Sequence, residues 1–262
     1  MRTITALFVG LGSIGTRHLK NLANLCADRG WTLQADALRS DLTRPLRPGA
    51  AELLHAQYTD LTAAPAHYDM VFITNPTSLH AEALRQVKGR GEALFIEKPI
   101  FSAEQTGLAL DELLPAGQKA YVAAPMRWCG AMLALKDRLP ALHPYCARVI
   151  CSSYLPDWRP GVDYRTVYSA RKALGGGVTI DLIHEWDYLV ELFGVPEKLY
   201  NFKGTYSELE IDSDDLSVYI AKYPTLLAEV HLDYFGRGYR RSIELFCRDG
   251  SYLADFGAGT LT

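Results

Sequence analysis

The sequence has few of the features that mark secreted, metal-bound or membrane-embedded proteins. Its five cysteines are an odd number and include no C-x-x-C pair, which argues against a disulfide framework and a thiolate zinc site. The stretch "HEWDY" at 184–188 does not match H-E-x-x-H, so it is not a zinc-protease motif. No apolar run approaches the roughly 18 residues of a membrane-spanning helix. We therefore expect a cytoplasmic protein with no metal site and no membrane partner.

An excess of charge is missing as well. The formal net charge of −3 and a pI near 6.2 give no reason to expect a nucleic-acid partner or an anionic membrane surface. A hydrophobic content of 48% and a charged content of 22% over 262 residues are typical of a soluble globular chain with one large domain or two ordinary ones. The N-terminal "TITALFVG" runs directly into a glycine motif without a small-residue cleavage site, and it predicts a buried strand rather than a signal peptide.

Residues 1–122 alternate between strand-like and helix-like patterns. Continuous apolar runs at 4–10, 70–75 and 93–98 predict strands that are buried on both faces, and 119–125 predicts a further one. Between the runs, apolar residues recur at helical spacing, most clearly over 13–29. Strands that alternate with helices predict a parallel, doubly wound sheet of the Rossmann type.

Residues 123–262 have a different character. Strand-like segments rich in β-branched and aromatic residues follow one another through short turns, including "YPT" at 223–225 and "DG" at 249–250. This predicts an α+β domain with a mostly antiparallel sheet, covered on its inner face by helices near 127–140 and around His184. The stretch 226–235 is apolar at both strand alternations, so the outer face is expected to pair in a homo-oligomer, a dimer or a tetramer.

The motif "GLGSIG" at 10–15 follows the first predicted strand and opens a predicted helix. In that context Gly10 allows a tight turn, Gly12 lets the backbone approach a pyrophosphate, and Gly15 packs the helix against the strand. Ser13 and Ile14 complete the phosphate-binding turn. The alternative is a glycine-rich turn that binds nothing.

The stretch "TLQADALRS" at 32–40 predicts the second strand of the sheet, and its end bears on the choice of nicotinamide cofactor. NAD-specific folds place an acid there, about 20 residues after the glycines. Here Arg39 and Ser40 occupy the strand end, while Asp36 falls inside the strand and Asp41 falls beyond it. A guanidinium can hold the 2′-phosphate of NADP, so the sequence favours NADP over NAD. The alternative is a solvated loop arginine.

A second candidate site is "GGGVTIDLIHEWDY" at 175–188. If the stretch is one helix, Asp181, His184 and Asp187 share a face, because positions three apart are neighbours on a helix. An imidazole titrates near neutrality and can exchange a proton with a substrate, and a carboxylate beside it sets its tautomer. The glycines at 175–177 would let the backbone approach substrate or cofactor closely. The ordinary alternatives are a core or surface histidine and an Asp187 that only anchors the helix.

Four segments together resemble the glucose–fructose oxidoreductase / inositol dehydrogenase (Gfo/Idh/MocA) family: "GLGSIGTRHLKNL", "ITNPTSLHAEAL", "FIEKPI" and "GGGVTIDLIHEWD". The E-K-P motif at 97–99 is the most specific of them. The resemblance implies a Rossmann domain, an open-faced α/β domain after it, and an active site between the two. It also implies NAD(P)-dependent hydride transfer involving a carbinol or ketone of a sugar, cyclitol or nucleotide sugar.

The resemblance assigns roles to three side chains of the reaction. Lys98 matches the lysine that contacts the reacting hydroxyl and the nicotinamide region, His184 matches the acid/base histidine, and Asp181 matches the acid that precedes it. The common family pattern spaces that acid and histidine by four residues, whereas here the spacing is three.

The resemblance also assigns a cofactor-binding loop. Asn75, Pro76 and His80 match the loop beside the nicotinamide ribose, and Glu97 belongs with Lys98 to the same region. Since X-Pro bonds are the usual place for a cis peptide, and the family points the same way, we predict a cis bond between Lys98 and Pro99.

Substrate-binding candidates combine arginines with aromatic rings. They are Arg127, Trp158, Arg159, Tyr164 and Arg165. Aromatic rings stack on sugars or bases and arginines pair with carboxylates or phosphates, which suits an anionic sugar, as in the family members of surface-polysaccharide and acidic amino-sugar pathways. A solvated basic loop is the alternative, and Arg127 would then support the cleft instead of lining it.

Two other functions fit the same fold. One is a cofactor-binding regulator without turnover, which would be free to lose the Lys98 and His184 pair. The other is a transferase or epimerase that uses tightly held NAD.

Overall fold

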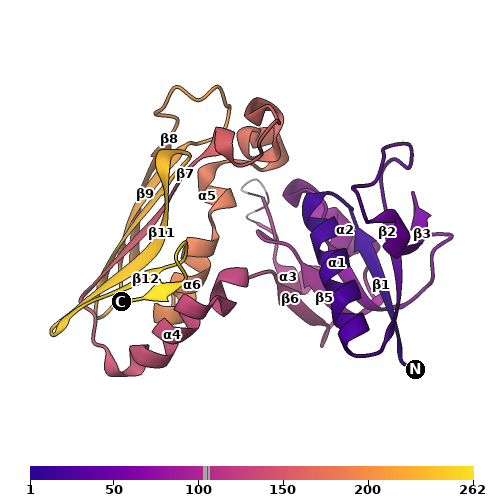
Figure 1. The fold of residues 1–262 in the computed structure, drawn as a ribbon, viewed down its shortest axis with the longest axis horizontal. Helices are drawn as coiled ribbons and strands as arrows, with labels where there is room; N and C mark the ends of the chain where they lie inside the picture. Colours follow the sequence, from indigo (N-terminus) through magenta and orange to yellow (C-terminus); the bar gives the residue numbers. More distant parts are fainter. Residues whose placement is uncertain (103–104, 106) are drawn as a thin grey trace. The chain divides into compact units, whose positions relative to one another are not determined.

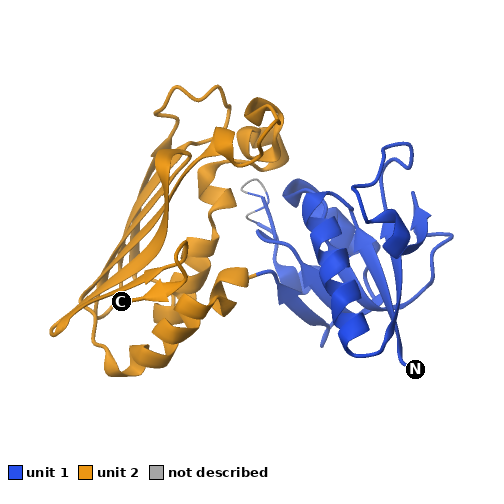
Figure 2. Cartoon of the chain, viewed as in Figure 1, with its two compact units in different colours: residues 1–123 blue, residues 124–262 orange. Residues whose placement is uncertain are grey.

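The computed structural model describes residues 1–102, 105 and 107–262. The chain forms two compact units, Met1–Ala123 and Ala124–Thr262, which Figure 2 shows in blue and orange. The expected boundary after residue 122 lies one residue before this division. Each unit has its own sheet and its own core, and each is described separately.

The first unit is a six-stranded parallel sheet in the order β3-β2-β1-β4-β5-β6. The strand order reverses between β1 and β4, as in the doubly wound folds that bind dinucleotides. The strands are β1 (Thr3–Val9), β2 (Thr32–Leu38), β3 (Leu54–Tyr58), β4 (Tyr68–Ile73), β5 (Gly91–Ile96) and β6 (Lys119–Val122). The helices are α1 (Ser13–Asp28), α2 (His80–Gln86) and α3 (Leu110–Leu113). The predicted Rossmann sheet is confirmed, with β3 as a strand that was not predicted.

The apolar runs of the first unit form strands because both faces of the sheet are covered. On β1, Phe8 stacks on Phe72 of β4 with ring centroids 4.4 Å apart on one face. Leu7 and Val9 pack into a second cluster on the opposite face, beside Ile73. The short edge strand β3 is only half-buried, with alternating exposure, and for this reason it lacks the continuous apolar signal of the other strands.

The second unit is a seven-stranded sheet in the order β13-β12-β11-β7-β10-β9-β8 (Figure 1). All neighbouring strands are antiparallel except β7 and β10, which run parallel. The strands are β7 (Cys146–Tyr154), β8 (Lys198–Gly204), β9 (Leu216–Lys222), β10 (Leu227–Asp233), β11 (Phe235–Cys247), β12 (Gly250–Asp255) and β13 (Thr260–Leu261). The predicted, mostly antiparallel sheet is confirmed.

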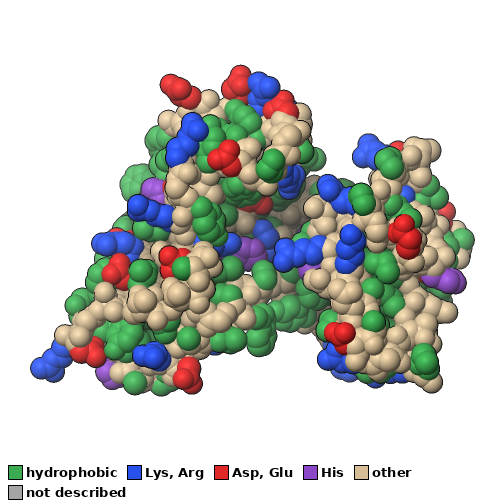
Figure 3. Space-filling view, viewed as in Figure 1, with side chains coloured by type: hydrophobic (Ala, Val, Ile, Leu, Met, Phe, Trp, Pro, Cys, Tyr) green, Lys and Arg blue, Asp and Glu red, His purple; other side chains and the backbone are tan. Residues whose placement is uncertain are grey.

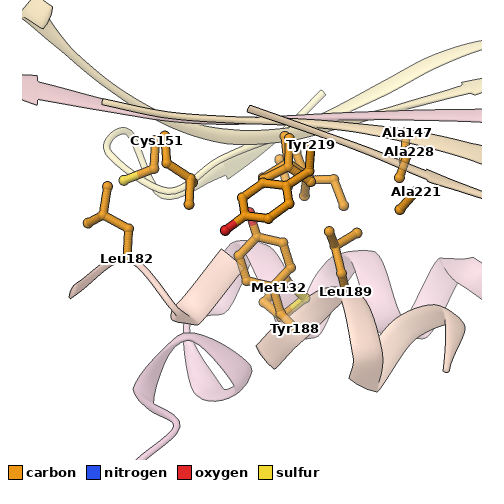
Figure 4. Close-up of a cluster of buried hydrophobic side chains, with 14 of the residues drawn as sticks. Met132, Ala147, Cys151, Leu182, Tyr188, Leu189, Tyr219, Ala221 and Ala228 are labelled. Atoms are coloured by element: carbon orange, nitrogen blue, oxygen red, sulfur yellow. The ribbon is translucent and has the colours of Figure 1, made fainter. Parts of the chain in front are cut away.

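The helices of the second unit cover one face of this sheet. They are α4 (Gly130–Arg138), α5 (Val178–Asp181) and α6 (His184–Phe193). Figure 4 shows the core between them, where Met132, Tyr188 and Leu189 face Cys151 and Tyr219 of the sheet. The opposite face of the sheet carries no helix, and Tyr200 and Phe202 of the edge strand β8 are exposed.

The described residues contain no helix that is long and apolar enough to cross a membrane. They also contain no group of three or more histidine, cysteine or acidic side chains placed to hold a metal ion. Acidic and basic side chains are interspersed over the face of both units seen in Figure 3.

Candidate active site

The glycine motif forms the turn between β1 and α1. A Cβ on Gly10, whose φ is +81°, would lie 2.7 Å from the Cα of Asn75, and a Cβ on Gly15 would lie 2.6 Å from the Gly10 carbonyl oxygen. These two glycines are therefore required by packing within the unit. A Cβ on Gly12 would meet no atom within 4 Å, and Ser13 next to it is exposed. The backbone at Gly12 is thus open to a ligand at the start of α1, as a dinucleotide site requires.

The end of β2 presents Arg39 to a hollow of about 400 Å³. Its guanidinium donates to Gln57 Oε1 at 2.7 Å and to the Arg44 carbonyl oxygen at 2.5 Å, which hold it in place. Arg44 and Arg47 line the same hollow, together with one acid, Glu52. The hollow is therefore predominantly cationic.

Neither aspartate near this strand end takes the usual position of the acid that binds the ribose of NAD. Asp36 is buried, accepting a hydrogen bond from the Tyr68 hydroxyl at 2.8 Å and lying 3.1 Å from His55 Nδ1. Asp41 accepts hydrogen bonds from the side chain and backbone of Thr43, and these bonds lower the pKa of the Asp41 carboxyl. Both carboxylates are thus engaged within the protein.

The loop after β4 holds the predicted nicotinamide-side residues. His80 is almost completely buried, with Nε2 2.9 Å from the Asn75 carbonyl oxygen and Nδ1 3.1 Å from the Pro99 carbonyl oxygen. Burial lowers the pKa of this imidazole, so at neutral pH it carries one N–H and donates to one of the two loops. We expect His80 to hold these loops together and not to touch a ribose. Pro76, next to Asn75, is exposed.

The E-K-P motif follows β5 at the same edge of the sheet. The bond between Lys98 and Pro99 is cis, which confirms the prediction. Glu97 is buried, and its Oε2 accepts the backbone N–H of Lys98 at 3.2 Å. Its Oε1 lies 2.6 Å from Nε2 of His18, a residue of α1 that sequence reasoning missed.

The stretch 178–188 does not form one helix, so the condition for a shared face is not met. Helix α5 ends at Asp181 and α6 begins at His184, and the chain bends through residues 182–183. Asp181, His184 and Asp187 therefore do not lie along one helix face. Asp187 accepts two hydrogen bonds from the Arg127 guanidinium, at 2.6 and 2.9 Å, which supports its role as a helix anchor.

Asp181 is held by a buried tyrosine from the sheet. The Tyr234 hydroxyl, just after β10, donates to Asp181 Oδ2 at 2.8 Å. Burial and the nearby Asp181 carboxylate both raise the pKa of Tyr234 well above its usual value, so the hydroxyl stays protonated and remains a donor. Trp158 packs edge-on against Tyr234 with centroids 5.2 Å apart, which places one predicted substrate residue near the candidate acid.

The glycines at 175–177 pack against the protein's own chain. A Cβ on Gly176 would lie 2.1 Å from the Tyr168 carbonyl oxygen, and a Cβ on Gly177, whose φ is +126°, would lie 2.5 Å from Asp214 Oδ1. Asp214 in turn accepts the backbone N–H and hydroxyl of Thr179 at 2.9 and 2.6 Å, at the start of α5. The close approach at Gly176 and Gly177 thus serves to place α5.

The predicted substrate arginines are engaged to different degrees. Arg127 also donates to Glu191 at 2.5 Å, and this second carboxylate supports the reading of Arg127 as a structural residue. Arg165 donates to Asp163 and to Glu210, each at 2.9 Å, within an exposed loop. Trp158 donates to the Ser153 hydroxyl, and the Tyr164 hydroxyl accepts the backbone N–H of Glu210. Arg159 is exposed with no hydrogen bond or ion pair among the described residues.

The match to a family of known proteins lies in the first unit. The model of the oxidoreductase family with an NAD-binding Rossmann fold, Gfo/Idh/MocA, matches residues 4–123. This match supports the resemblance to the Gfo/Idh/MocA oxidoreductases over the first unit, whose fold is that of a dinucleotide-binding Rossmann domain.

Relatives extend the likeness beyond residues 4–123. The chain is 24% identical over 267 residues to the uncharacterized oxidoreductase YrbE of Bacillus subtilis, covering 97% of this chain and 74% of YrbE. It is 26% identical over 200 residues to the inositol 2-dehydrogenase of Rhizobium meliloti, covering 73% of this chain and 56% of that enzyme. The chain therefore spans little more than half the length of the inositol dehydrogenase.

Solved structures share the fold at low identity. The WlbA dehydrogenase of Chromobacterium violaceum, in complex with NADH and UDP-GlcNAcA, aligns with a TM-score of 0.79 and 21% identity over 97% of this chain and 74% of its own. The WlbA dehydrogenase of Bordetella pertussis, in complex with the same two ligands, aligns with a TM-score of 0.80 and 18% identity. The alignment covers 100% of this chain and 82% of that dehydrogenase. The chain thus shares the fold of these dehydrogenases in both units.

Proposed function

We propose that the protein transfers a hydride between NAD(P) and a carbinol or ketone carbon of a sugar or nucleotide sugar. One observation carries the proposal. The glycine turn after β1, the Asn75 loop after β4 and Lys98 after β5 all follow parallel strands, and so they lie at one edge of the Rossmann sheet. That edge is where open α/β sheets bind their ligands, and here it brings an amine to a dinucleotide fold.

The side chains available match the needs of this reaction. Bound nicotinamide supplies the hydride acceptor or donor. As the hydride leaves a carbinol, its hydroxyl proton must leave too and the developing alkoxide must be stabilised. In this proposal His184, the first residue of α6, exchanges the proton, and the Lys98 ammonium stabilises the alkoxide. Asp181, fixed by Tyr234, can favour the imidazolium form of a nearby histidine.

Absorbance at 340 nm tests the proposal directly. The purified protein should oxidise or reduce the nicotinamide with at least one member of a panel of sugars, cyclitols and nucleotide sugars. The panel should include inositol and UDP-GlcNAcA, named with the relatives above. Absence of turnover with every compound, together with tight NADPH binding, would favour a non-catalytic regulator on the same fold. Mass spectrometry of the purified protein would detect a tightly held NAD and so point to a transferase or epimerase.

We further propose NADP as the preferred cofactor. The cationic hollow at Arg39 supports this choice, because a 2′-phosphate there would meet a guanidinium already held in place by Gln57. The engagement of Asp36 with Tyr68 supports it as well, since this buried carboxylate is turned to the Tyr68 hydroxyl inside the protein.

We also propose a cytoplasmic homo-oligomer, a dimer or a tetramer. The uncovered face of the second sheet contains a hollow of about 570 Å³ whose lining includes Ile150 and Val218, and Tyr200 and Phe202 are exposed on the same side. Burying such a face against a second copy would remove apolar surface from water. The five cysteines are all free thiols, which suits the reducing cytoplasm. Light scattering at micromolar concentration should show more than a monomer.

A further inference from the structure

His18 and Glu97 form a short contact between two elements of the first unit. His18 lies on α1, the helix that begins at the glycine turn, and Glu97 follows β5. Nε2 of His18 is 2.6 Å from Oε1 of Glu97, and both side chains are largely buried, with exposed fractions of 17% and 11%. A carboxylate only accepts hydrogen bonds, so Nε2 carries the proton and donates it. In such a place a charge-assisted hydrogen bond is strong and directional.

The second oxygen of the same carboxylate reaches the backbone of the lysine. Glu97 Oε2 accepts the N–H of Lys98 at 3.2 Å, while the Glu97 N–H itself donates to the Ile73 carbonyl oxygen at 2.9 Å. The carboxylate therefore has one oxygen on α1 and the other on the residue whose amine the proposed reaction uses. If the His18 donor were lost, the Glu97 side chain would be free to rotate away from the Lys98 amide.

The surroundings of His18 indicate that the ring is held for its nitrogen and not only for its bulk. Its ring packs against Phe95 at 4.8 Å and Phe72 at 6.2 Å between centroids, so an aromatic hydrocarbon could fill the space. A buried imidazole among phenylalanines is costly unless its polar atoms are satisfied, and Glu97 satisfies one of them. Gly15, three residues earlier and on the same side of α1, packs on the Gly10 carbonyl oxygen and Thr74.

We infer that His18 is a positioning residue for Lys98. It orients the Glu97 carboxylate, and the carboxylate fixes the backbone from which the lysine side chain extends. Helix α1 and the backbone of Lys98 are thus linked by one chain of hydrogen bonds. The inference rests on the proposed function for the role of Lys98, but the hydrogen-bonded chain itself can be tested without any substrate.

Two substitutions of His18 separate the effect of its hydrogen-bond donor from that of its ring, and a third substitution serves as control. His18→Phe keeps the aromatic packing on Phe95 and Phe72 and removes the donor. His18→Gln loses the ring but can place an amide N–H where Nε2 was. His67→Phe is the matched control, since His67 is exposed in the loop before β4.

The test measures the hydrogen-exchange rate of the Lys98 amide by NMR, with the Glu97 amide as internal reference. His18→Phe should raise the Lys98 exchange rate roughly tenfold or more, while the Glu97 amide, bonded within the sheet, stays unchanged. His18→Gln should stay within about threefold of the parent, and His67→Phe should not differ from it. An unchanged exchange rate of the Lys98 amide in His18→Phe would overturn the inference. An exchange rate raised as much in His18→Gln as in His18→Phe would overturn it as well.

A second measurement tests whether the effect of His18→Phe passes through the Glu97 carboxylate. In a Glu97→Gln background the contact is already weakened, so adding His18→Phe should raise the Lys98 exchange rate by less than about threefold. A full tenfold increase in that background would overturn the inference. Once a panel substrate is found, His18→Phe should lower kcat with the NADPH Kd unchanged, and His18→Gln should restore most of it. Lack of turnover in the parent would count against the proposed function alone, because the exchange result stands by itself.

Discussion

The two units hold their reactive side chains in different ways. In the first unit, Lys98 sits in a three-residue motif, and its backbone is tied to the carboxylate of its own neighbour, Glu97. In the second unit, Asp181 lies on α5, which is held by Tyr234 after β10 and by Asp214 before β9. His184 lies on α6, where Glu185 accepts a hydrogen bond from Arg241 of β11 at 2.7 Å. The first arrangement is local, and a short motif is enough to recognise it. The second depends on tertiary contacts.

The largest expected effect tests whether both units supply a side chain that catalysis needs. We expect Lys98→Met and His184→Ala each to lower kcat at least roughly a hundredfold, the low end for acid–base groups. NADPH binding, measured by nicotinamide fluorescence, should change little in either variant. Near-normal turnover in one of them would assign the chemistry to the other unit.

The cofactor prediction tests the first unit alone. Arg39→Ala should weaken NADP binding by on the order of 1.5–3 kcal/mol, the range for a hydrogen bond to a charged group, and should affect NAD much less. Arg85→Ala is the matched control, because Arg85 is an exposed arginine on α2 that lies 3.8 Å from Glu82. Isothermal titration with both cofactors measures the difference. Equal losses for NADP and NAD would contradict the assignment.

In the second unit, Tyr234→Phe should lower the free energy of unfolding by about 1–2 kcal/mol, because Asp181 loses a donor inside the protein. Tyr200→Phe is the control, because it removes a hydroxyl from a tyrosine that is 63% exposed. It should change the free energy of unfolding by less than about 0.5 kcal/mol. Urea denaturation of the two variants provides the comparison. If they were equally stable, the long-range tie between β10 and α5 would carry no energy.

The smallest expected effect concerns the uncovered face of the second sheet. Burial alone would raise the pKa of Asp233, but hydrogen bonds from His231, Ser152 and Gly236 outweigh it and lower the pKa below 3.8. A carboxyl with a lowered pKa in the folded state adds stability above its unfolded pKa and loses it as the pH falls through the folded pKa. Asp233→Asn should therefore be less stable by on the order of 1 kcal/mol at pH 7.

The pH dependence of that difference is the decisive measurement. The difference in free energy of unfolding between Asp233→Asn and the parent should decrease below about pH 4. At that pH the Asp233 carboxyl of the unfolded parent takes up a proton. A gap that stays constant from pH 7 to pH 3 would show that the charge of Asp233 has no part in it. Thermal unfolding at several pH values supplies the data.

The sequence predicted the first unit better than the second, and the reason is physical. Runs buried on both faces identify strands without any partner information, and the glycine turn and the cis bond before Pro99 depend on neighbours in the chain. His18 and Tyr234 were missed because their partners lie 79 and 53 positions away, a separation that no periodicity records. For His18, the one local clue was its place three residues after Gly15, on the side of α1 that faces the sheet.

The errors in the second unit came from treating local patterns as continuous structure. Asp181, His184 and Asp187 would share one face only if the helix were continuous. The helix is interrupted at residues 182–183, so they do not. The glycines at 175–177 were expected to approach a ligand, but Gly176 and Gly177 instead approach the chain itself. A positive φ or a close contact can be expected from glycine, but the sequence does not say what the glycine contacts.

The parallel pairing of β7 with β10 has a consequence for how the chain folds as it is made. Both hydrogen-bonded neighbours of β7, which are β10 and β11, come later in the sequence, and the helices α5 and α6 are synthesised before either of them. A nascent chain that ends in α6 therefore displays a central strand with two open edges and two helices without a sheet beneath them. Domains usually fold in order as they leave the ribosome. Residues 1–123 can complete their sheet early, whereas the second unit must wait until Cys247 has emerged, and its half-made state is where chaperones would be needed most.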